Sequence, residues 1–147
     1  TGWKQFPGES APDRIYKIGH ATSPDGIHWS KDEGRALVPD RLGPDECQAL
    51  PSVIQVDNRY LMVFCYREAY GFRNDPSRSY RLGQAWSDDL VNWTRADDLP
   101  RFEREAGAWD TDMVCYPHLS EIDGRIVLLY NGNAFGREGF GAAVLEP

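Results

Sequence analysis

The chain has 147 residues and a formal net charge of −7, and 41% of its residues are hydrophobic. A chain of this length forms one domain and buries about 68–70% of its unfolded surface. The acidic balance argues against a nucleic acid or an anionic membrane as partner, because both require a surface rich in Lys and Arg. No apolar run approaches the roughly 20 residues of a membrane helix.

The first predicted strand covers Tyr16–Ser23, and a short strand surrounds Trp29. A hairpin follows, in which "PSVIQV" and "YLMVFCY" (51–56 and 60–66) are joined by an Asp57-Asn58 turn. Tyr80–Ser87 and a short strand around Trp93 then repeat the first pair. These segments are short runs of β-branched and aromatic residues between turn signals, which favours antiparallel strands.

A second hairpin joins "PHLSEI" to "RIVLLYN" (117–122 and 125–131) across Asp123-Gly124, and "FGAAVLE" (140–146) adds a further strand. No segment repeats apolar residues at helical spacing for the three or four turns of a stable helix. The sequence therefore predicts an all-β fold.

These elements form a repeat. "YKIGHATSPDGIHWSK" (16–31) returns 64 residues later as "YRLGQAWSDDLVNWTR" (80–95), and "PSVIQVDNRYLMVFCYR" (51–67) matches "PHLSEIDGRIVLLYNGN" (117–133) 66 residues later. A fixed period of tens of residues is typical of solenoids, propellers and arrays. The unit has four antiparallel strands in about 65 residues, so we predict a β-propeller blade.

The repeated phrase contains a turn. Asp25 and Asp89 are placed to accept hydrogen bonds from the backbone N–H groups of their own turns. Gly26 suits a left-handed position, and the Trp four residues after each Asp is expected to pack between sheets. A ligand-binding carboxylate is the alternative, but a turn brace needed by every blade explains the repetition better.

Three segments follow from this repeat: 1–40 holds outer strands of one blade, 41–100 a complete blade, and 101–147 most of a further blade. The prediction is an open, partial propeller of about two to three four-stranded blades, because closure takes four to eight. Unpaired sheet edges are normally covered or joined to another chain, so we expect a homo-oligomer.

The three cysteines, Cys47, Cys65 and Cys115, form neither a disulfide framework nor a zinc motif. We expect buried, reduced thiols and, with no signal peptide visible, a cytoplasmic protein. No ligand spacing indicates calcium, and no cofactor is expected.

Three stretches carry a family resemblance: the Ser-x-Asp-Gly-x-x-Trp turn (23–29), the "DNRYLM" hairpin (57–62) and "LLYNGNAFGREGFGAAVLE" (128–146). Together they resemble the five-bladed propeller glycosidase superfamily, which includes the family 43 and invertase-like family 32 enzymes, over its C-terminal half. The resemblance implies catalytic carboxylates on the innermost strands, facing a central channel: a nucleophile or base, an orienting group and a general acid. It also implies that the blade with the nucleophile or base precedes residue 1.

The resemblance makes Glu46, Asp110 and Asp112 the candidate catalytic residues, near the expected starts of two innermost strands. Glu46 and Asp112 each lie five residues before a proline. Glu46-Cys47 is similar to the Glu-Cys-Pro acid/base motif, although the proline here is Pro51. Glycoside cleavage needs two carboxyl groups about 5–9.5 Å apart, one of them protonated. A like charge on Asp45 is expected to raise the pKa of Glu46; the alternative is a solvated or structural Glu46.

Candidate substrate-binding residues surround these carboxylates: Asp45, Arg67, Tyr70, Arg73, Trp109, Tyr116, His118 and Asn131. Arg67 binds a sugar hydroxyl or forms a salt bridge with a nearby acid. Trp109 either contacts a sugar or packs between blades. His118 shares a face with Tyr116 and is expected to be buried and hydrogen-bonded. Asn131 offers an amide, although Gly132 also suits a turn or bulge.

Three functions remain open from the sequence: a glycosidase, a carbohydrate-binding module without catalysis, and an assembly module. Carbohydrate is the expected partner in the first two. Activity of the isolated chain is doubtful because one of the required carboxylates is expected outside it.

Overall fold

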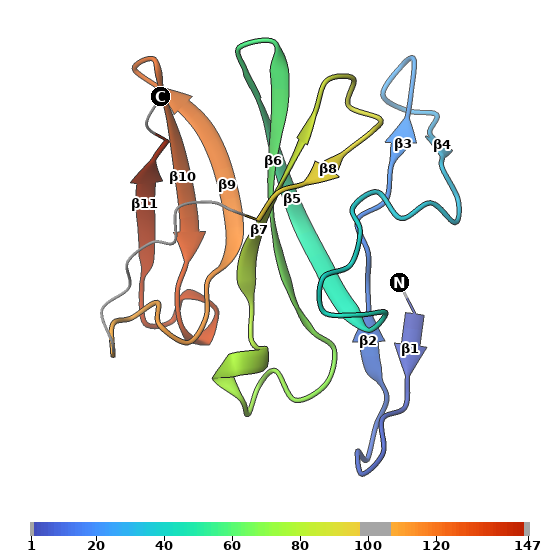
Figure 1. Cartoon of the computed structure of the whole chain (residues 1–147), viewed down its shortest axis with the longest axis vertical. Coiled ribbons are helices and arrows are strands. Elements are labelled where there is room, and N and C mark those ends of the chain that lie inside the picture. The colour runs from blue at the N-terminus through green and yellow to red at the C-terminus, as the bar shows by residue number, and fades with distance from the viewer. Residues whose placement is uncertain (1, 98–106, 146–147) are drawn as a thin grey trace.

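The computed structural model describes residues 2–97 and 107–145. The strands form four antiparallel sheets, with the sheet of β9–β11 on the left of Figure 1, that of β5–β8 in the centre, and the pairs β3–β4 and β1–β2 at the upper and lower right. No α-helix occurs in the described residues, and two single-turn 3-10 helices are the only helical elements there. The elements are β1 (Gly2–Lys4), β2 (Asp13–Ile15), β3 (Ala21–Thr22), β4 (Ser30–Lys31), β5 (Glu46–Val56), β6 (Arg59–Glu68), η1 (Pro76–Arg78), β7 (Arg81–Ser87), β8 (Thr94–Arg95), β9 (Cys115–Ile122), β10 (Arg125–Asn131), η2 (Ala134–Gly136) and β11 (Phe140–Val144).

The all-β prediction is confirmed, with the predicted hairpins in place. β5 pairs with β6 and β9 with β10, each across an Asp that takes a left-handed backbone: Asp57 at φ 53° and Asp123 at φ 50°. Asp tolerates this conformation better than most residues, because its short polar side chain hydrogen-bonds locally. The boundary predicted between residues 100 and 101 lies outside the described residues.

β6 is buried on both faces, which explains its continuous apolar run. Met62, Phe64 and Tyr66 pack toward Ile18 and Val38 in one core cluster. The alternate residues of β6 meet other elements: Leu61 and Val63 pack with β9 and β10 residues in a second cluster, and Cys65 joins a third beneath the loops. The sheet of β5–β8 is therefore sandwiched between its neighbours.

Each of β5 and β9 contains one bulge in front of the matched prolines. In β5 the pairing passes from Ala49–Cys65 to Ser52–Val63, so that Leu50 and Pro51 together oppose one residue. β9 repeats this irregularity opposite Tyr130, where Tyr116 and Pro117 are the two residues involved. The residue before each proline has a positive φ, 51° and 57° respectively. Strands β5 and β9 also touch, because the Leu119 N–H donates to Ser52 Oγ at 2.8 Å.

The repeated turn has the predicted brace in both copies. Asp25 Oδ1 accepts hydrogen bonds from the N–H groups of Ile27 and His28, and Asp89 Oδ1 accepts them from Val91 and Asn92. A hydrogen bond from His28 lowers the pKa of Asp25, and one from the Asn92 backbone lowers that of Asp89.

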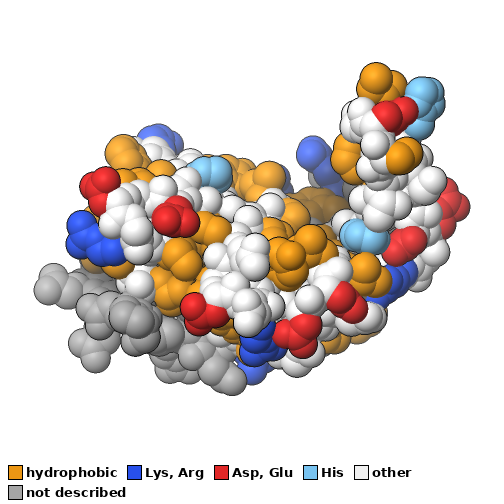
Figure 2. Space-filling view, turned by 90° about the horizontal axis from the view of Figure 1, so that it is seen from above, with side chains coloured by type: hydrophobic (Ala, Val, Ile, Leu, Met, Phe, Trp, Pro, Cys, Tyr) orange, Lys and Arg blue, Asp and Glu red, His pale blue; other side chains and the backbone are white. Residues whose placement is uncertain are grey.

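The two tryptophans of these turns differ. Trp93 packs against the Phe64 cluster, whereas Trp29 is 59% exposed, so its predicted packing between sheets is wrong. The turn that holds Trp29 joins β3 to β4, on the right of Figure 1. On the same side of Figure 2, a part of the molecule protrudes into solvent and carries exposed hydrophobic side chains. Too few neighbours surround that turn to cover its indole.

Candidate functional site

The larger described pocket lies at the end of the sheets where β6 and β10 end. It has a volume of about 480 Å³ between the Phe72–Ser79 loop and the loop that follows β10. In Figure 1 these loops lie toward the lower end of the molecule. The lining residues are Phe72, Arg73, Asn74, Pro76, Ser79, Asp112, Met113, Asn133, Ala134, Phe135, Arg137 and Glu138. Two carboxylates, two guanidinium groups and two aromatic rings thus share one hollow.

Asn133 organises the acidic side of this pocket. Its Oδ1 accepts hydrogen bonds from the N–H groups of Asp112 and Met113 at 2.9 and 3.0 Å. Its Nδ2 donates to the Ala108 carbonyl and to Glu138 Oε2, both at 3.2 Å. A single buried amide therefore fixes the backbone of Asp112 and the carboxylate of Glu138 together.

Of the predicted catalytic residues, Asp112 lines the pocket and the other two do not. Asp110 is buried and accepts a hydrogen bond from the Tyr130 hydroxyl at 3.0 Å. β5 begins at Glu46 as predicted, but β9 begins at Cys115, so Asp110 and Asp112 precede their strand.

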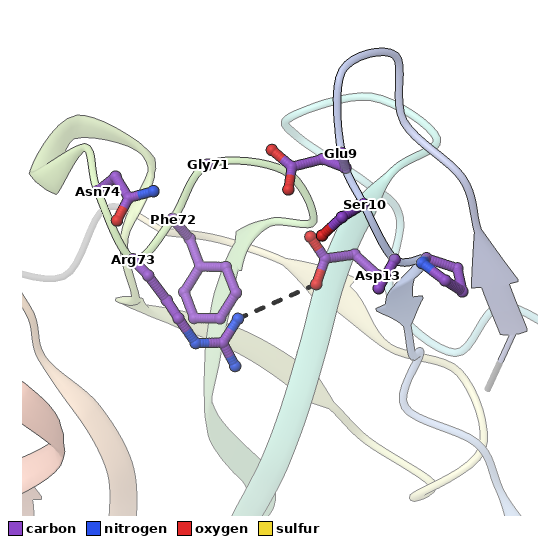
Figure 3. Close-up of a pocket in the computed structure, with 9 residues that line it drawn as sticks. Glu9, Ser10, Asp13, Gly71, Phe72, Arg73 and Asn74 are labelled. Atoms are coloured by element: carbon purple, nitrogen blue, oxygen red, sulfur yellow. Dashed lines mark ion pairs between the residues drawn. The ribbon is translucent and has the colours of Figure 1, made fainter.

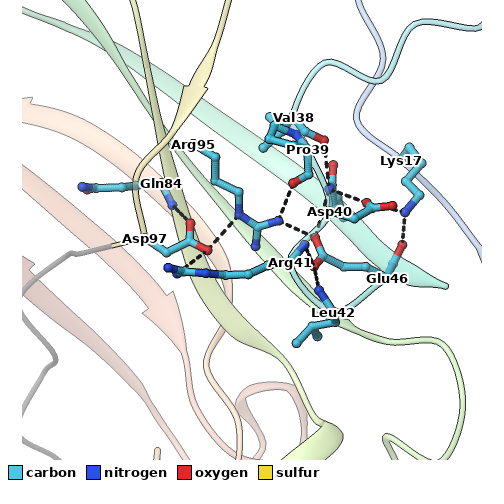
Figure 4. A network of polar contacts seen from close by, with 11 residues as sticks. Lys17, Val38, Pro39, Asp40, Arg41, Leu42, Glu46, Gln84, Arg95 and Asp97 are labelled. Carbon is cyan, nitrogen blue, oxygen red and sulfur yellow. Dashed lines mark hydrogen bonds and ion pairs between the residues drawn. The ribbon is translucent and has the colours of Figure 1, made fainter. Parts of the chain in front are cut away.

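Glu46 lies at the centre of a buried polar network (Figure 4). Its side chain is fully buried, and Oε1 accepts hydrogen bonds from Arg95 Nη1 at 2.6 Å and Gln48 Nε2 at 2.9 Å. Oε2 accepts from the N–H groups of Arg41 and Leu42, both at 2.8 Å. Four donors occupy the roughly four acceptor sites of an ionised carboxylate.

The pKa of Glu46 is lowered, which corrects the prediction that Asp45 raises it. Burial alone raises this pKa, but the hydrogen bonds from Arg41, Arg95 and the other donors outweigh burial. Asp45 instead pairs with Lys4, whose Nζ lies 2.6 Å from Oδ2. A carboxylate held ionised in this way lacks the proton that a general acid must donate.

Arg67 is buried beneath the loops, 3% exposed. It donates to the Tyr16 hydroxyl and to the carbonyls of Glu68 and Ala69, and not to the carboxylates of Asp45, Glu46 or Glu68, whose ion pair was one of the two roles expected of it. The Tyr16 hydroxyl also forms a short hydrogen bond with the Tyr80 hydroxyl. Burial, together with that hydrogen bond, raises the pKa of Tyr80, so this phenol stays protonated beside Arg67.

Arg73 and Phe72 form a wall between two pockets. The Phe72 ring lies between two guanidinium groups, with Arg67 at 3.6 Å and Arg73 at 4.2 Å from its centroid. A smaller pocket of about 230 Å³ lies on the other side, between the β1–β2 loop and residues 71–74 (Figure 3). There Arg73 Nη1 faces Asp13 Oδ1 at 4.0 Å.

The remaining predicted binding residues are spread around these pockets. Tyr70 packs on Phe6, and Trp109 stacks on Tyr130 at 5.6 Å, over the backbone of Gly132 and Gly141. Trp109 thus packs over β10 and β11, against the core cluster that β6, β9 and β10 share. Asn131 donates to the Phe135 carbonyl at 3.4 Å, and the predicted bulge lies beside it.

His118 shares a face of β9 with Tyr116, as predicted, but that face is exposed. The expected burial of His118 is therefore wrong, although its Nε2 does lie 3.1 Å from Ser120 Oγ. Phe135, Arg137 and Glu138 are pocket residues that the sequence analysis missed. The glycines around them, Gly132, Gly136 and Gly139, were the available signal for a functional loop.

The described residues contain no cluster of three or more His, Cys, Asp or Glu side chains suited to a metal ion. The described segments also hold no helix with the length and apolar character needed to cross a bilayer. All three cysteines are free and buried, and burial raises the pKa of Cys115 to about 12. These thiols are therefore poor nucleophiles, and the pocket's chemistry is that of carboxylates, guanidinium groups and amides.

No family model matches the chain. An uncharacterized protein of Mycobacterium tuberculosis (strain ATCC 25618 / H37Rv) is 34% identical over 146 residues, which cover 99% of this chain and 44% of that protein. A β-1,2-mannobiose phosphorylase of Thermoanaerobacter sp. (strain X514) is 33% identical over 88 residues, 56% of this chain and 27% of that protein. The chain thus spans less than half of the length of these curated relatives.

Solved glycoside hydrolases share the fold. One superposes on 89% of this chain and 36% of its own with a TM-score of 0.63 and 21% sequence identity. A thermostable family-43 glycoside hydrolase covers 69% of this chain and 33% of its own, with a TM-score of 0.51 and 14% identity. The chain is therefore structurally similar to part of the five-bladed propeller glycoside hydrolases, which confirms the predicted resemblance.

Proposed function

We propose that this chain binds carbohydrate in the larger pocket, as part of a propeller protein that cleaves glycosidic bonds by hydrolysis or phosphorolysis. The fold shared with glycoside hydrolases and the sequence similarity to a mannobiose phosphorylase support this reaction class. On this proposal, the β5–β8 sheet is a four-stranded blade and the β9–β11 sheet is most of the next.

The observation that carries the proposal is the polar composition of the pocket. Asp112, Glu138, Arg73 and Arg137 line the same hollow, together with the amides of Asn74 and Asn133. Sugars are bound by such groups because carboxylates accept two hydroxyl hydrogen bonds and guanidinium groups donate in a planar fork. Phe72 and Phe135 supply the apolar lining that ligand pockets usually combine with a few polar groups.

We infer that the isolated chain binds saccharide without hydrolytic turnover. Glycosidic hydrolysis needs a second carboxyl group at a defined separation from the first. Glu46, the predicted acid, is fully buried and saturated with donors. Asp112 and Glu138 both line the pocket. Glu138 Oε2 already accepts a hydrogen bond from the Asn133 amide, so the catalytic partner of Asp112 is expected from another part of the whole protein.

The test measures the binding of a panel of disaccharides to the purified wild-type chain and to Asp112→Asn. Saturation-transfer NMR detects the binding. We expect wild type to bind at least one disaccharide and Asp112→Asn to bind it at least about tenfold more weakly, as expected when a charged hydrogen-bond acceptor is lost. Asp45→Asn is the matched control, because Asp45 pairs with Lys4 outside the pocket.

Two results would contradict the proposal: no binding of any saccharide by wild type, or equal weakening by both substitutions. Hydrolytic turnover by the isolated chain would contradict the inference that a second carboxylate comes from elsewhere.

The expected homo-oligomer also remains a proposal. It is supported by exposed Phe140 and Val144 on edge strand β11, and the solution mass from light scattering tests it.

A further inference from the structure

Two aromatic side chains stand exposed beside the larger pocket on unusual backbone. Tyr116 is 38% exposed at φ 57°, and Phe135 is 41% exposed at φ 60°. Bulky residues rarely take a left-handed conformation, because the side chain crowds the backbone. Such conformations persist where the surrounding structure holds them, and they concentrate at binding sites and ligand clamps.

Local structure holds both residues in place. Tyr116 is one of the two β9 residues that oppose Tyr130 in the bulge, and Pro117 follows it directly. Phe135 lies in η2 between Ala134, at φ 52°, and Gly136, at φ 90°. The N–H of Gly136 donates to the carbonyls of Gly132 and Asn133, which closes this tight turn.

Both rings rest on the same buried residue, Tyr80. The Tyr80 ring centroid lies 6.3 Å from that of Tyr116 and 6.1 Å from that of Phe135, with an edge-on angle of 73° to Phe135. The two outer rings lie 6.2 Å apart and are inclined by only 30°. Tyr80 itself is 5% exposed, packs edge-on to Phe72 and is hydrogen-bonded to Tyr16. The outer rings are therefore positioned before any ligand arrives.

The first copy of the repeat shows that the aromatic ring at residue 116 is not required by the bulge. Leu50 occupies the equivalent position before Pro51, at φ 51° and 51% exposed. An aliphatic side chain is therefore compatible with this left-handed backbone. The Tyr of the second copy is an addition to the shared architecture, beside the loop that lines the pocket.

We propose that Tyr116 and Phe135 form a stacking platform that selects a neutral pyranose ring with one C–H face free of axial hydroxyl groups. This proposal rests on the carbohydrate-binding function proposed above. The apolar face of the ring lies on the two aromatic side chains, since aromatic faces attract C–H groups and bury apolar area. Phe135 lines the pocket together with Arg137, Glu138 and Asp112, so the hydroxyl groups of the same sugar lie within reach of polar partners.

The experiment compares Tyr116→Leu and Phe135→Leu with wild type. Titrations use methyl β-D-galactopyranoside and methyl β-D-mannopyranoside, which keep one face clear, and methyl α-D-altropyranoside, which has axial groups on both faces. We expect wild type to prefer the first two sugars. Each substitution weakens their binding by about 3- to 10-fold, the range for loss of one aromatic contact. Each substitution also reduces the preference for the galactoside and the mannoside over the altroside. A purely structural role of these residues would not change this preference.

Phe140→Leu is the matched control, because Phe140 is 76% exposed at the start of β11 and does not line the pocket. One outcome would overturn the platform but not the proposed function. In it, saccharide binding depends on Asp112, but Tyr116→Leu and Phe135→Leu change neither its affinity nor its selectivity. Absence of saccharide binding by wild type overturns the proposed function instead. If Phe135→Leu fails to fold, Tyr116→Leu decides the question, because Leu50 shows that leucine is accepted at this bulge.

Discussion

Glu46 and Asp112 occupy the same position in the two repeats, each five residues before a bulge proline, yet their surroundings are opposite. Glu46 is completely buried and accepts four hydrogen bonds. Asp112 lines the larger pocket, and its backbone N–H donates a hydrogen bond to Asn133 Oδ1. Both copies of the repeat therefore share the hairpin, the bulge and the proline, while the carboxylate five residues before the proline belongs to a buried polar network in one copy and to the pocket in the other.

The difference arises from neighbours that are distant in sequence. Arg95, on strand β8, donates to the Glu46 carboxylate and also pairs with Asp97 at 2.8 Å. The backbone N–H groups of Arg41 and Leu42 are the other distant donors to Glu46. In the described residues, the sheet of β9–β11 has three strands and offers no counterpart to Arg95. Glu46 is held in place because a fourth strand brings Arg95 to it. Asp112 remains accessible beside a sheet whose three described strands bring no such cation.

The largest expected effect comes from removing that cation. Arg95→Met leaves the buried Glu46 carboxylate without its charged partner, and breaking a buried ion pair from one side costs about 3–5 kcal/mol. Both side chains are more than nine-tenths buried, so solvent screening offers little relief. The free energy of unfolding from urea titration, followed by tryptophan fluorescence, measures the loss.

Arg59→Met is the control for this substitution. Arg59 pairs with Asp88 at 2.9 Å, but both side chains are largely exposed. Its removal is expected to cost less than about 1 kcal/mol. Equal losses in the two variants would mean that the Glu46–Arg95 pair does not lock the first repeat.

Acid should release the same lock. Because the folded pKa of Glu46 is lowered from 4.5, its contribution to stability is complete above that value and is lost as the pH falls through the folded pKa. Glu46→Gln removes this contribution, so wild type and variant should differ most in stability near pH 7 and converge in acid. Urea titrations of both proteins from pH 7 down to about pH 3 measure the difference. Asp112→Asn, at the exposed position of the second repeat, is the comparison at pH 7 and should cost much less stability than Glu46→Gln, because it breaks no buried ion pair. A gap between wild type and Glu46→Gln that is independent of pH contradicts the assignment.

The hairpins and the repeated turns were predictable because their signals are local. Asp57 and Asp123 mark tight turns between alternating strands, and Ser23-x-Asp25 and Ser87-x-Asp89 brace their turns within a few residues. The matched prolines coincide with the two bulges, since Pro51 and Pro117 each follow a left-handed residue, but the bulges at these prolines were not predicted. These features depend on nearest neighbours along the chain, which the sequence displays directly.

The environment of the candidate site was not predictable in the same way. Glu46 and Arg95 are separated by 49 residues, and nothing in the sequence near Glu46 indicates that its neighbour is a buried cation. For His118, alternation predicted the face it shares with Tyr116, but which face of β9 is covered depends on other sheets. Trp29 and Trp93 stand in nearly the same local sequence, and only Trp93 has a core cluster beside it.

The smallest expected effect compares the two repeated turns at one residue. Gly26 has φ 73° and Leu90 has φ 63° at equivalent positions, and the carbonyl of each accepts a hydrogen bond from a tryptophan indole. A left-handed non-glycine residue costs roughly 1–2 kcal/mol, whereas the extra freedom of glycine in the unfolded chain costs about 0.5–1 kcal/mol. Leu90→Gly should therefore raise the stability by up to about 1.5 kcal/mol, the largest difference between these two effects. The melting temperature from circular dichroism measures this gain.

Val91→Gly, next in the same turn but without a positive φ, should lower stability instead, because it adds the cost of glycine without relieving strain. A loss of stability in Leu90→Gly as large as that in Val91→Gly would mean that Leu90 contributes packing that outweighs its backbone strain.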